Sequence, residues 1–556
     1  MNTSNKSENS RRRVTYYDVS PYAALSANAT TSNNIKGFSE VRKLFTENMN
    51  FRSMQTCEHN YTILDGTHYA FSNNTNIALW GNELSLSNRL LPSNVVLDVR
   101  FGGLQSSRGM SFSFDAANNG YSDMLNVKWY KDNTLLSEAT VYPDSAAYSY
   151  EHPVEFYNRV VITFNRLNKA GRYLKVEAVY FGAVRVFGDG ELESLTINEG
   201  VDPTGRTIYI SSASFTINTK DSVQYMFQKR QPVKIAYTNS SLTDLSQPMG
   251  TYYIDRSRKH ANGRYTVEAV DKIGVLDSGD EYMGGIYNSV TAEAVVEAIV
   301  GGIFDVEIDD ELKNIPINGW IPIMKRREAL AQVALAIGAI IDATRTDSIK
   351  IRKMTSAVSR TIGKSEVYQS SSVEVEFPCT GVEVIEHNFV TGRTSKDLHK
   401  DTFTGERLVK FSEPVSNLTI ENGVILMSGA NYAMIQGVGT DETLLSGRPY
   451  IDNQNSVTVR TEQIVEGTQE RVEKIDKGYL INRAISQSVA QRLYEYYLRQ
   501  NAFDGDYKMA ANNPDRIGDI VKISTVFGAP VLGQIEKLTL YLGWENIKAR
   551  GIVRGN

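Results

Sequence analysis

The chain has 556 residues, of which 41% are hydrophobic and 22% are charged, and this composition is that of a folded protein. One hydrophobic core cannot serve a chain of this length, so we expect several domains. The net charge of −5 argues against a dedicated duplex-DNA binder. The two cysteines, Cys57 and Cys379, are expected to be buried apolar side chains, because a disulfide or metal site needs closer spacing or more ligands.

The first residues contain no apolar segment of the kind found in signal peptides, so we expect a protein made in a cytoplasm without a classical export signal. The longest apolar run, 330–341, is too short to cross a bilayer and fits a buried helix better. No membrane span is therefore expected. The 30 tyrosines and 41 glycines favour a β-rich chain, because tyrosine suits the half-buried face of a sheet.

Residues 1–55 are expected to form an N-terminal arm, because they are polar over most of their length. The run Arg11, Arg12 and Arg13 fits two interpretations. One is a solvated charged tail, and the other is a contact to phosphate or to an acidic neighbouring subunit.

Residues 56–182 are predicted to form a β-sandwich. Short runs with strand character follow one another and are separated by turn sequences, and no long helix interrupts them. Antiparallel pairing is the simplest arrangement for such a series. The runs are 111–115, 126–132, 135–143, 159–167 and 173–182.

Residues 183–277 are predicted to form a small β-barrel. Turn sequences at 202–203 and 262–263 separate runs in which apolar and polar residues alternate. The alternating apolar residues are Ile208, Ile210, Phe215 and Ile217.

The apolar spacing changes to that of helices in residues 278–355, where helices are predicted over 291–302 and 327–341. Thr291 is a plausible N-cap for the first helix. A turn and a strand follow the second helix, so this segment is predicted to be an α/β domain.

The rest of the chain returns to strands, with one further helix predicted over 479–503. Strands are expected in 356–394, hairpins in 395–476 and barrel-like strands towards the end of the chain. The tyrosines Tyr494, Tyr496 and Tyr497 on the helix are expected to pack against neighbours rather than to bind a cofactor.

A search for catalytic patterns predicts no catalytic, cofactor-binding or metal-binding residues. None of the six histidines has metal-ligand spacing, and neither a GxSxG elbow nor a Walker loop is present. Cys379 and His387 could meet across a hairpin, but no orienting third group is evident. The acidic run 307–312 fits a solvated loop better than a cation site. A glycosidase would need two opposed carboxylates, which sequence alone cannot pair.

From Cys57 to about Met354 the chain resembles the tail-tip proteins of bacteriophages of Gram-positive bacteria and of phage-like tail particles. Several phrases in the same order carry this resemblance. They are EHNYTILDGTHY (58–69), IALWGNELS (77–85), FNRLNKAGRYLKVEAVYFG (164–182), FQKRQPVKI (227–235), GTYYIDR (250–256), AVDKIGVLD (269–277), GGIYNSVTAEAVVEAIV (284–300) and REALAQVALAIGAIIDATRTDSIKI (327–351).

The resemblance implies a multidomain, mainly β (α+β) tail hub, in which an α/β domain lies between two hub-type β-barrels. The Gly-Asp-Ile-Val turn at 518–521 matches a hub element. It would place the second barrel in 356–394 and 505–556, with 395–504 as an insertion of β-hairpins and a long helix. The implied function is structural and not enzymatic: closing the tail tube and anchoring receptor-binding or spike components in the virion, after assembly in the bacterial host cytoplasm.

The resemblance also implies a homotrimer whose partners are a tail-tube or distal tail protein, the tape-measure protein and a receptor-binding fibre or spike protein. DNA would pass through the ring at most transiently. No cofactor is implied.

The sandwich 56–182 resembles discoidin-like, carbohydrate-binding-module folds, which leaves a second hypothesis of a host-surface glycan-binding adhesin. A sugar site would need exposed aromatic side chains beside polar ones. The candidates are Trp80, Tyr121, Trp129 and Tyr130, and core packing or docking to other tail proteins are the competing roles. A third hypothesis is an enzyme that degrades peptidoglycan.

Overall fold

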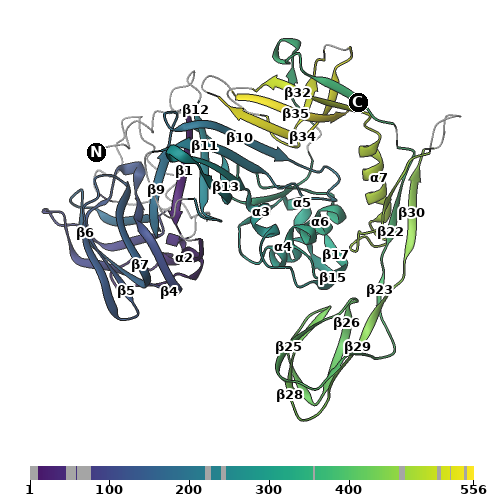
Figure 1. The fold of residues 1–556 in the computed structure, drawn as a ribbon, viewed down its shortest axis with the longest axis horizontal. Helices are drawn as coiled ribbons and strands as arrows, with labels where there is room; N and C mark the ends of the chain where they lie inside the picture. Colours follow the sequence, from purple (N-terminus) through teal and green to yellow (C-terminus); the bar gives the residue numbers. More distant parts are fainter. Residues whose placement is uncertain are drawn as a thin grey trace. The chain divides into compact units, whose positions relative to one another are not determined.

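The structure is a computed structural model in which the chain forms two compact units, Met1–Glu193 with Thr216–Val267 and Ser194–Phe215 with Glu268–Asn556. Strands predominate in both units (Figure 1), which confirms the prediction of a multidomain, mainly β protein. The structure describes residues 11–19, 21–45, 58, 77–219, 227–238, 246–354, 357–377, 379–461, 470–509, 515–525, 528–543 and 547–555.

The first unit contains a seven-stranded antiparallel sheet with the order β3-β8-β4-β7-β5-β6, in which β2 also pairs with β4. Register shifts in the long β4–β7 ladder bend both strands, as bulges do, and one sheet can then enclose a core. Apolar side chains of β3, β4, β5, β7 and β8 fill this core. The edge strand β6 contributes only Val141 to it. The strands are β2 (Asn28–Thr31), β3 (Leu79–Leu84), β4 (Leu90–Phe114), β5 (Ser122–Lys131), β6 (Thr134–Val141), β7 (Ala147–Leu167) and β8 (Tyr173–Tyr180), with the short helices α2 (Pro21–Ser26) and η1 (Val41–Phe45) beside them and η2 (Ala116–Asn118) before β5.

The second set of strands in the first unit has the order β14-β13-β12-β1-β9. Strand β1 comes from the segment that the sequence predicts to be an arm, and it pairs antiparallel with both β9 and β12. The strands are β1 (Arg12–Val19), β9 (Gly182–Phe187), β12 (Pro232–Thr238), β13 (Ser246–Lys259) and β14 (Arg264–Val270), with η3 (Ala261–Gly263) between the last two.

Of the three consecutive arginines, Arg12 is buried and does not form part of a solvated tail. Its Nε lies 2.7 Å from Oδ1 of Asp189, and its Nη2 donates to the carbonyl of Leu192 at 3.0 Å. Arg12 thus ties β1 to the turn before β10 (Leu192–Gly200). Neither phosphate nor a second subunit is needed to explain its burial.

The segment 183–277 is shared between the two units, because β11 (Ser212–Asn218) and β14 have residues in each. The alternation around Ile208 and Ile210 does not produce a strand there. Asp202 accepts hydrogen bonds from the backbone N–H groups of Thr204 (2.9 Å) and Thr207 (3.0 Å) and holds this stretch in a turn. The domain boundaries drawn from the sequence stay predictions.

In the second unit a sheet runs in the order β21-β32-β35-β34-β10-β11, and β33 pairs with both β34 and β20. Phe503, Leu538 and Val553 lie buried on three of its strands. The further strands are β20 (Val358–Ile362), β21 (Ser372–Val375), β32 (Asn501–Lys508), β33 (Ile520–Ile523), β34 (Val531–Leu542) and β35 (Ile547–Gly555), with η4 (Lys364–Glu366) after β20.

The predicted α/β segment, 278–355, shares one buried core with Ile208, with Ile273 and Leu276 of the preceding helix α3, and with Leu480, and the helices α4 and α6 contribute to it. The Thr291 Oγ1 caps α4 as predicted by accepting from the N–H of Ala294. Helix α6 is shorter than the predicted 327–341, because Gly338 ends it in a left-handed conformation at φ 73°. The elements are α3 (Lys272–Asp277), β15 (Gly285–Thr291), α4 (Ala292–Val300), β16 (Val306–Ile308), α5 (Asp310–Lys313), β17 (Pro316–Ile321), α6 (Arg326–Ile337), β18 (Ile340–Asp342) and β19 (Ile349–Arg352).

Asp271 begins α3 as its N-cap and is fully enclosed. Its carboxylate accepts from the N–H groups of Gly274 and Ser211, both at 3.0 Å, yet burial raises its pKa to about 6 from an ordinary value of 3.8. The folded state therefore holds this proton more tightly than the unfolded state does, and this group makes the protein less stable as pH rises through that interval.

The free energy of unfolding of the wild type, relative to that of Asp271→Asn, should fall by about 3 kcal/mol between about pH 4 and pH 7, since asparagine does not titrate there. Urea-unfolding midpoints measured across this range test the prediction. Parallel pH curves for the two proteins would contradict it.

The segment from β22 to β31, residues 381–475, is here called the extension. Its root consists of the sheet β30-β22-β31, and Figure 1 shows β23 and β29 continuing outward from β22 and β30. Helix α7 (Ser486–Tyr497) packs on β22 and is shorter than the predicted 479–503. The strands are β22 (Gly381–Glu386), β23 (Phe389–Thr391), β24 (Lys396–Asp401), β25 (Thr404–Lys410), β26 (Val415–Glu421), β27 (Gly423–Ser428), β28 (Tyr432–Val438), β29 (Thr443–Asp452), β30 (Asn455–Arg460) and β31 (Val472–Ile475).

Among the described residues, no helix combines the length and the apolar character needed to cross a membrane. Cys379 is a free, buried thiol as predicted, and Cys57 lies outside the described residues.

Candidate functional site

The four aromatic residues proposed for a glycan site do not form one exposed platform. Trp129 is 0% exposed and Trp80 is 3% exposed, so both belong to the interior of the first unit and present no ring to a sugar. On β5 the side chains alternate between the two faces, and the inward position falls on Trp129, leaving its neighbour Tyr130 half-buried. Tyr130 lies under the guanidinium of Arg159, 5.1 Å from its ring centre.

Tyr121 is placed differently, because it lines a small hollow of the first unit that opens to solvent. The hollow lies where the turn before β5 meets the turn before β8. It is here called the Tyr121 pocket. Its lining residues are Asp115, Asn118, Gly120, Tyr121, Leu167, Asn168, Lys169, Arg172, Tyr173 and Lys175.

An ion-pair group lies at the inner side of the Tyr121 pocket. Nζ of Lys175 contacts a carboxylate oxygen of Glu58 and lies 4.0 Å from Oδ2 of Asp115. The side chains of all three residues are at most 4% exposed. Burial lowers the pKa of Lys175 in spite of these carboxylates. The same Nζ lies 5.2 Å from the ring centre of Trp80, which gives that buried tryptophan a place beneath the pocket.

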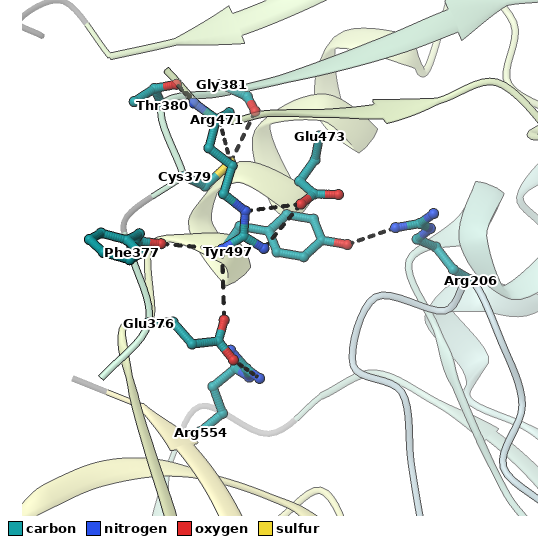
Figure 2. A network of polar contacts seen from close by, with 10 residues as sticks. All are labelled: Arg206, Glu376, Phe377, Cys379, Thr380, Gly381, Arg471, Glu473, Tyr497 and Arg554. Atoms are coloured by element: carbon teal, nitrogen blue, oxygen red, sulfur yellow. Dashed lines mark hydrogen bonds and ion pairs between the residues drawn. The ribbon is translucent and has the colours of Figure 1, made fainter. Parts of the chain in front are cut away.

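The second unit contains a different polar arrangement, which joins the extension to the main sheet (Figure 2). Arg471, just before β31, extends its guanidinium to three groups. Nη1 donates to the carbonyl of Phe377 at 3.2 Å and lies 3.8 Å from Glu376, while Nη2 lies 3.1 Å from Glu473. The Arg471 backbone N–H donates to Oγ1 of Thr380 at 2.8 Å.

Glu376 receives a second arginine, Arg554 of β35, at 2.7 Å. The hydrogen bond from Arg554 holds the pKa of Glu376 below its ordinary value and raises that of Arg554. Arg554 also lies 3.3 Å from Glu536, which accepts from the hydroxyl of Tyr496 at 2.6 Å. On the other side, Tyr497 accepts from Arg206 at 2.9 Å.

These contacts of Glu376, Phe377 and Thr380 join β21, at the edge of the main sheet, to β22, at the root of the extension. The sequence gives no signal for them, because opposite charges such as Glu376 and Arg554 stand far apart along the chain. The prediction that the tyrosines of α7 are packing residues agrees with Tyr494 and Tyr497 packing on the core beside β22.

Replacing Arg471 by methionine should loosen this connection without unfolding the unit. The guanidinium is partly exposed, so screening limits the loss of overall stability to about 1 kcal/mol or less. Backbone hydrogen exchange, measured by mass spectrometry, should nevertheless become faster in 372–381. Added salt should also speed the exchange of this segment in the wild type, because it screens the ion pairs. Arg448→Met, at an exposed position of β29, is the matched control. Equal exchange in both variants would contradict the prediction.

The described residues include no group of three or more histidine, cysteine, aspartate or glutamate side chains placed to hold a metal ion. In the acidic run 307–312, Lys313 lies 2.8 Å from Asp310 and Lys353 pairs with Glu311. Cys379 contacts the carbonyl of Gly381, whereas His387 pairs with Asp452, so neither contact joins the thiol to the imidazole.

Comparison with known proteins finds no matching family and no matching curated protein. Solved structures that are similar include a tail protein of Neisseria meningitidis MC58, with 10% identity, 69% of this chain and 94% of that chain covered, and a TM-score of 0.43. The prophage MuSo2 43 kDa tail protein of Shewanella oneidensis has 9% identity, with 66% of this chain and 94% of that chain covered and a TM-score of 0.41. The prophage tail protein gp18 of Listeria monocytogenes EGD-e has 11% identity, with 67% of this chain and 91% of that chain covered and a TM-score of 0.39.

Proposed function

We propose that this chain is a structural component of the tail tip or baseplate hub of a phage or phage-like particle. It would close the tail tube and anchor receptor-binding or spike components, and it would act as a homotrimer. The ordered phrases that resemble tail-tip proteins support this proposal. The structural observation that carries it is the extension, whose outer part has a small core and exposes apolar side chains that are suited to burial against a partner.

The outer part of the extension, residues 389–452, has very little interior of its own. Six of its described apolar side chains are buried, with at most 9% exposure, namely Val409, Val415, Ala430, Ala433, Ile435 and Leu445, and four of these form its one core cluster. A module with so small a core gains little stability from hydrophobic burial. The same strands expose a larger set of apolar side chains, between 40% and 57% accessible: Val390, Leu408, Val424, Leu426, Met427, Val438 and Ile451.

Several of these exposed side chains gather on the sheet β25-β28-β27. Leu408 and Met427 both pair with Met434 in register, so the three form one row across the sheet. Methionine adapts its shape to a contacting surface, and contiguous exposed apolar rows mark protein–protein contacts. The surface is therefore suited to burial against another copy of the chain or another tail component.

The test is the mass of the purified chain in solution, by light scattering and native mass spectrometry. The wild type should have three times the 62.0 kDa chain mass. Val424→Glu with Met427→Glu should shift it towards the single-chain mass with an unchanged circular dichroism spectrum, and Ser428→Glu on the same strand should not. A wild type that stays a single chain at high concentration would overturn the homotrimer and weaken the hub proposal.

The tail-tube or distal tail protein, the tape-measure protein and a fibre or spike protein are the partners proposed for the assembled ring. We propose a structural rather than a catalytic role, so the purified chain should release no soluble fragments from peptidoglycan at any pH or with added divalent metals. Release of such fragments would favour the peptidoglycan-degrading alternative.

A further inference from the structure

We propose that Lys175 and Asp115 of the first unit join in an intramolecular isopeptide bond, an amide between the lysine Nζ and the carboxyl carbon, with Glu58 as the group that moves the proton. This inference goes beyond the tail-hub proposal and does not depend on it, because the three residues lie within one unit of one chain. Three observations carry it: strand pairing places the amine opposite the carboxyl, a second carboxylate contacts the amine, and all three groups are enclosed.

Strands β4 and β8 fix the two reacting groups opposite each other. They pair antiparallel, with Phe114 of β4 opposite Val176 of β8. One step further in the same register places Asp115, the residue after β4, opposite Lys175. Side chains of opposite residues lie on the same side of a sheet, and here Nζ of Lys175 is 4.0 Å from Oδ2 of Asp115. Reacting atoms come together at roughly 3–3.5 Å, so a small movement of the flexible lysine side chain is sufficient.

The two carboxylates have different partners, and these partners assign their roles. Glu58 contacts Nζ of Lys175 and is oriented by the backbone N–H of Tyr173, which donates to its Oε1 at 2.7 Å. It is therefore placed to take a proton from the amine. Asp115 accepts from Nδ2 of Asn118, at 3.1 Å on one oxygen and 3.3 Å on the other. Such a donor stabilises the negative charge that develops on these oxygens when the carbon is attacked.

The surroundings favour a reactive amine and a neutral product. The side chain of Lys175 is 3% exposed, those of Glu58 and Asp115 are 0% and 4% exposed, and the ring centre of Trp80 lies 5.2 Å from Nζ. Burial lowers the pKa of Lys175, which favours the neutral amine that acts as a nucleophile. Charged groups are costly to bury, and the reaction replaces an ammonium and a carboxylate by a neutral amide.

The reaction is a condensation that releases one water and needs no oxidant, reductant or further reactant. The ammonium of Lys175 gives one proton to Glu58, and the neutral Nζ then forms a bond to Cγ of Asp115. One C–O bond of Asp115 breaks, and the leaving oxygen takes the proton held by Glu58 and a second proton from the nitrogen. Glu58 returns to its starting form. The water leaves through the Tyr121 pocket, which Asp115 and Lys175 line and which opens to solvent.

Mass spectrometry of the full chain, purified and then denatured, tests the proposal. The wild type should weigh about 18 Da less than its sequence, the mass of one water, and Lys175→Arg should have the full mass of its sequence. After digestion with trypsin, residues 109–128 and 173–185 should be found as one joined species that is not cleaved after Lys175. Lys169→Arg, at an exposed position of the same pocket, is the matched control and should keep the loss of water.

Two further variants separate the reacting carboxyl from the proton carrier. Asp115→Asn should lose about 17 Da, the mass of ammonia, because the side-chain amide then supplies the leaving group. Glu58→Gln should form the bond at least about tenfold more slowly, since the group that moves the proton is missing. Circular dichroism establishes that each variant is folded, and the mass of the wild type decides the question where a variant is not.

Four results would overturn the inference. A wild type that keeps its full mass after days at neutral pH would show that Lys175 is an ion-pair partner and nothing more. A joined species of residues 53–89 and 173–185 would place the bond on Glu58. A loss of about 18 Da from Asp115→Asn would show that Asp115 is not the reacting carboxyl. Bond formation by Glu58→Gln at the rate of the wild type would remove the role given to Glu58.

Discussion

Glu199→Leu is expected to destabilise the second unit by about 3–5 kcal/mol, since it removes one partner of a fully buried ion pair. Nε and Nη2 of Arg345 donate to the two carboxylate oxygens of Glu199, both at 2.8 Å, and neither side chain has any exposure. The guanidinium keeps its charge at any accessible pH. The variant therefore leaves a buried charge without the carboxylate that balances it.

Hydrogen exchange measured by mass spectrometry on peptides from 194–215 and 340–352 tests this prediction locally, and urea unfolding gives the magnitude. Combining Glu199→Leu with Arg345→Met should recover most of the lost stability, because an apolar pair of similar volume often replaces a buried ion pair at no cost. Asp504→Asn, which breaks the exposed pair with Arg550, should change the midpoint little. A double variant as unstable as Glu199→Leu would show that the loss of stability comes from altered packing and not from the unbalanced charge of Arg345.

Trp129→Ala is the second change with a large expected effect, about 3–5 kcal/mol on the first unit. Trp129 is the largest fully buried side chain in the described part of the chain, and on β5 it lies between its partners Ser137 on β6 and Val160 on β7. Among the described residues its indole N–H has no hydrogen-bond partner. The loss should therefore come from the cavity and from lost apolar burial.

Urea unfolding followed by circular dichroism, with hydrogen exchange of 122–167 as the local measurement, checks this value. The local measurement matters because the two units need not unfold together. Trp129→Phe should cost clearly less than alanine, and the exposed Tyr142→Ala should cost little. A loss below about 1 kcal/mol for Trp129→Ala would contradict the assignment of this residue to the core.

The glycan hypothesis shows that residue type alone does not predict which aromatic side chains are exposed. Trp80 and Trp129 were selected as aromatic residues, but both lie in the interior. Trp129 falls on an inward position of β5, whereas Trp80 belongs to a stretch of β3 that is buried on both faces. Tyr121 lines a pocket, and its neighbours there come from a turn about fifty residues further along the chain. No local pattern could have grouped Tyr121 with Asn168, Arg172 and Lys175.

The sequence by itself determined the mainly β class and the position of the helices α4 and α6, because strand and helix periodicities act over a few neighbouring residues. Only the tertiary structure decided that β1 pairs with β9 and β12, that Glu376 meets Arg471 and Arg554, and that Tyr121 and Arg172 line the same hollow. Periodicity tells which face of an element is apolar. It does not tell which distant element covers that face, and in this protein the proposed sites are made by such distant contacts.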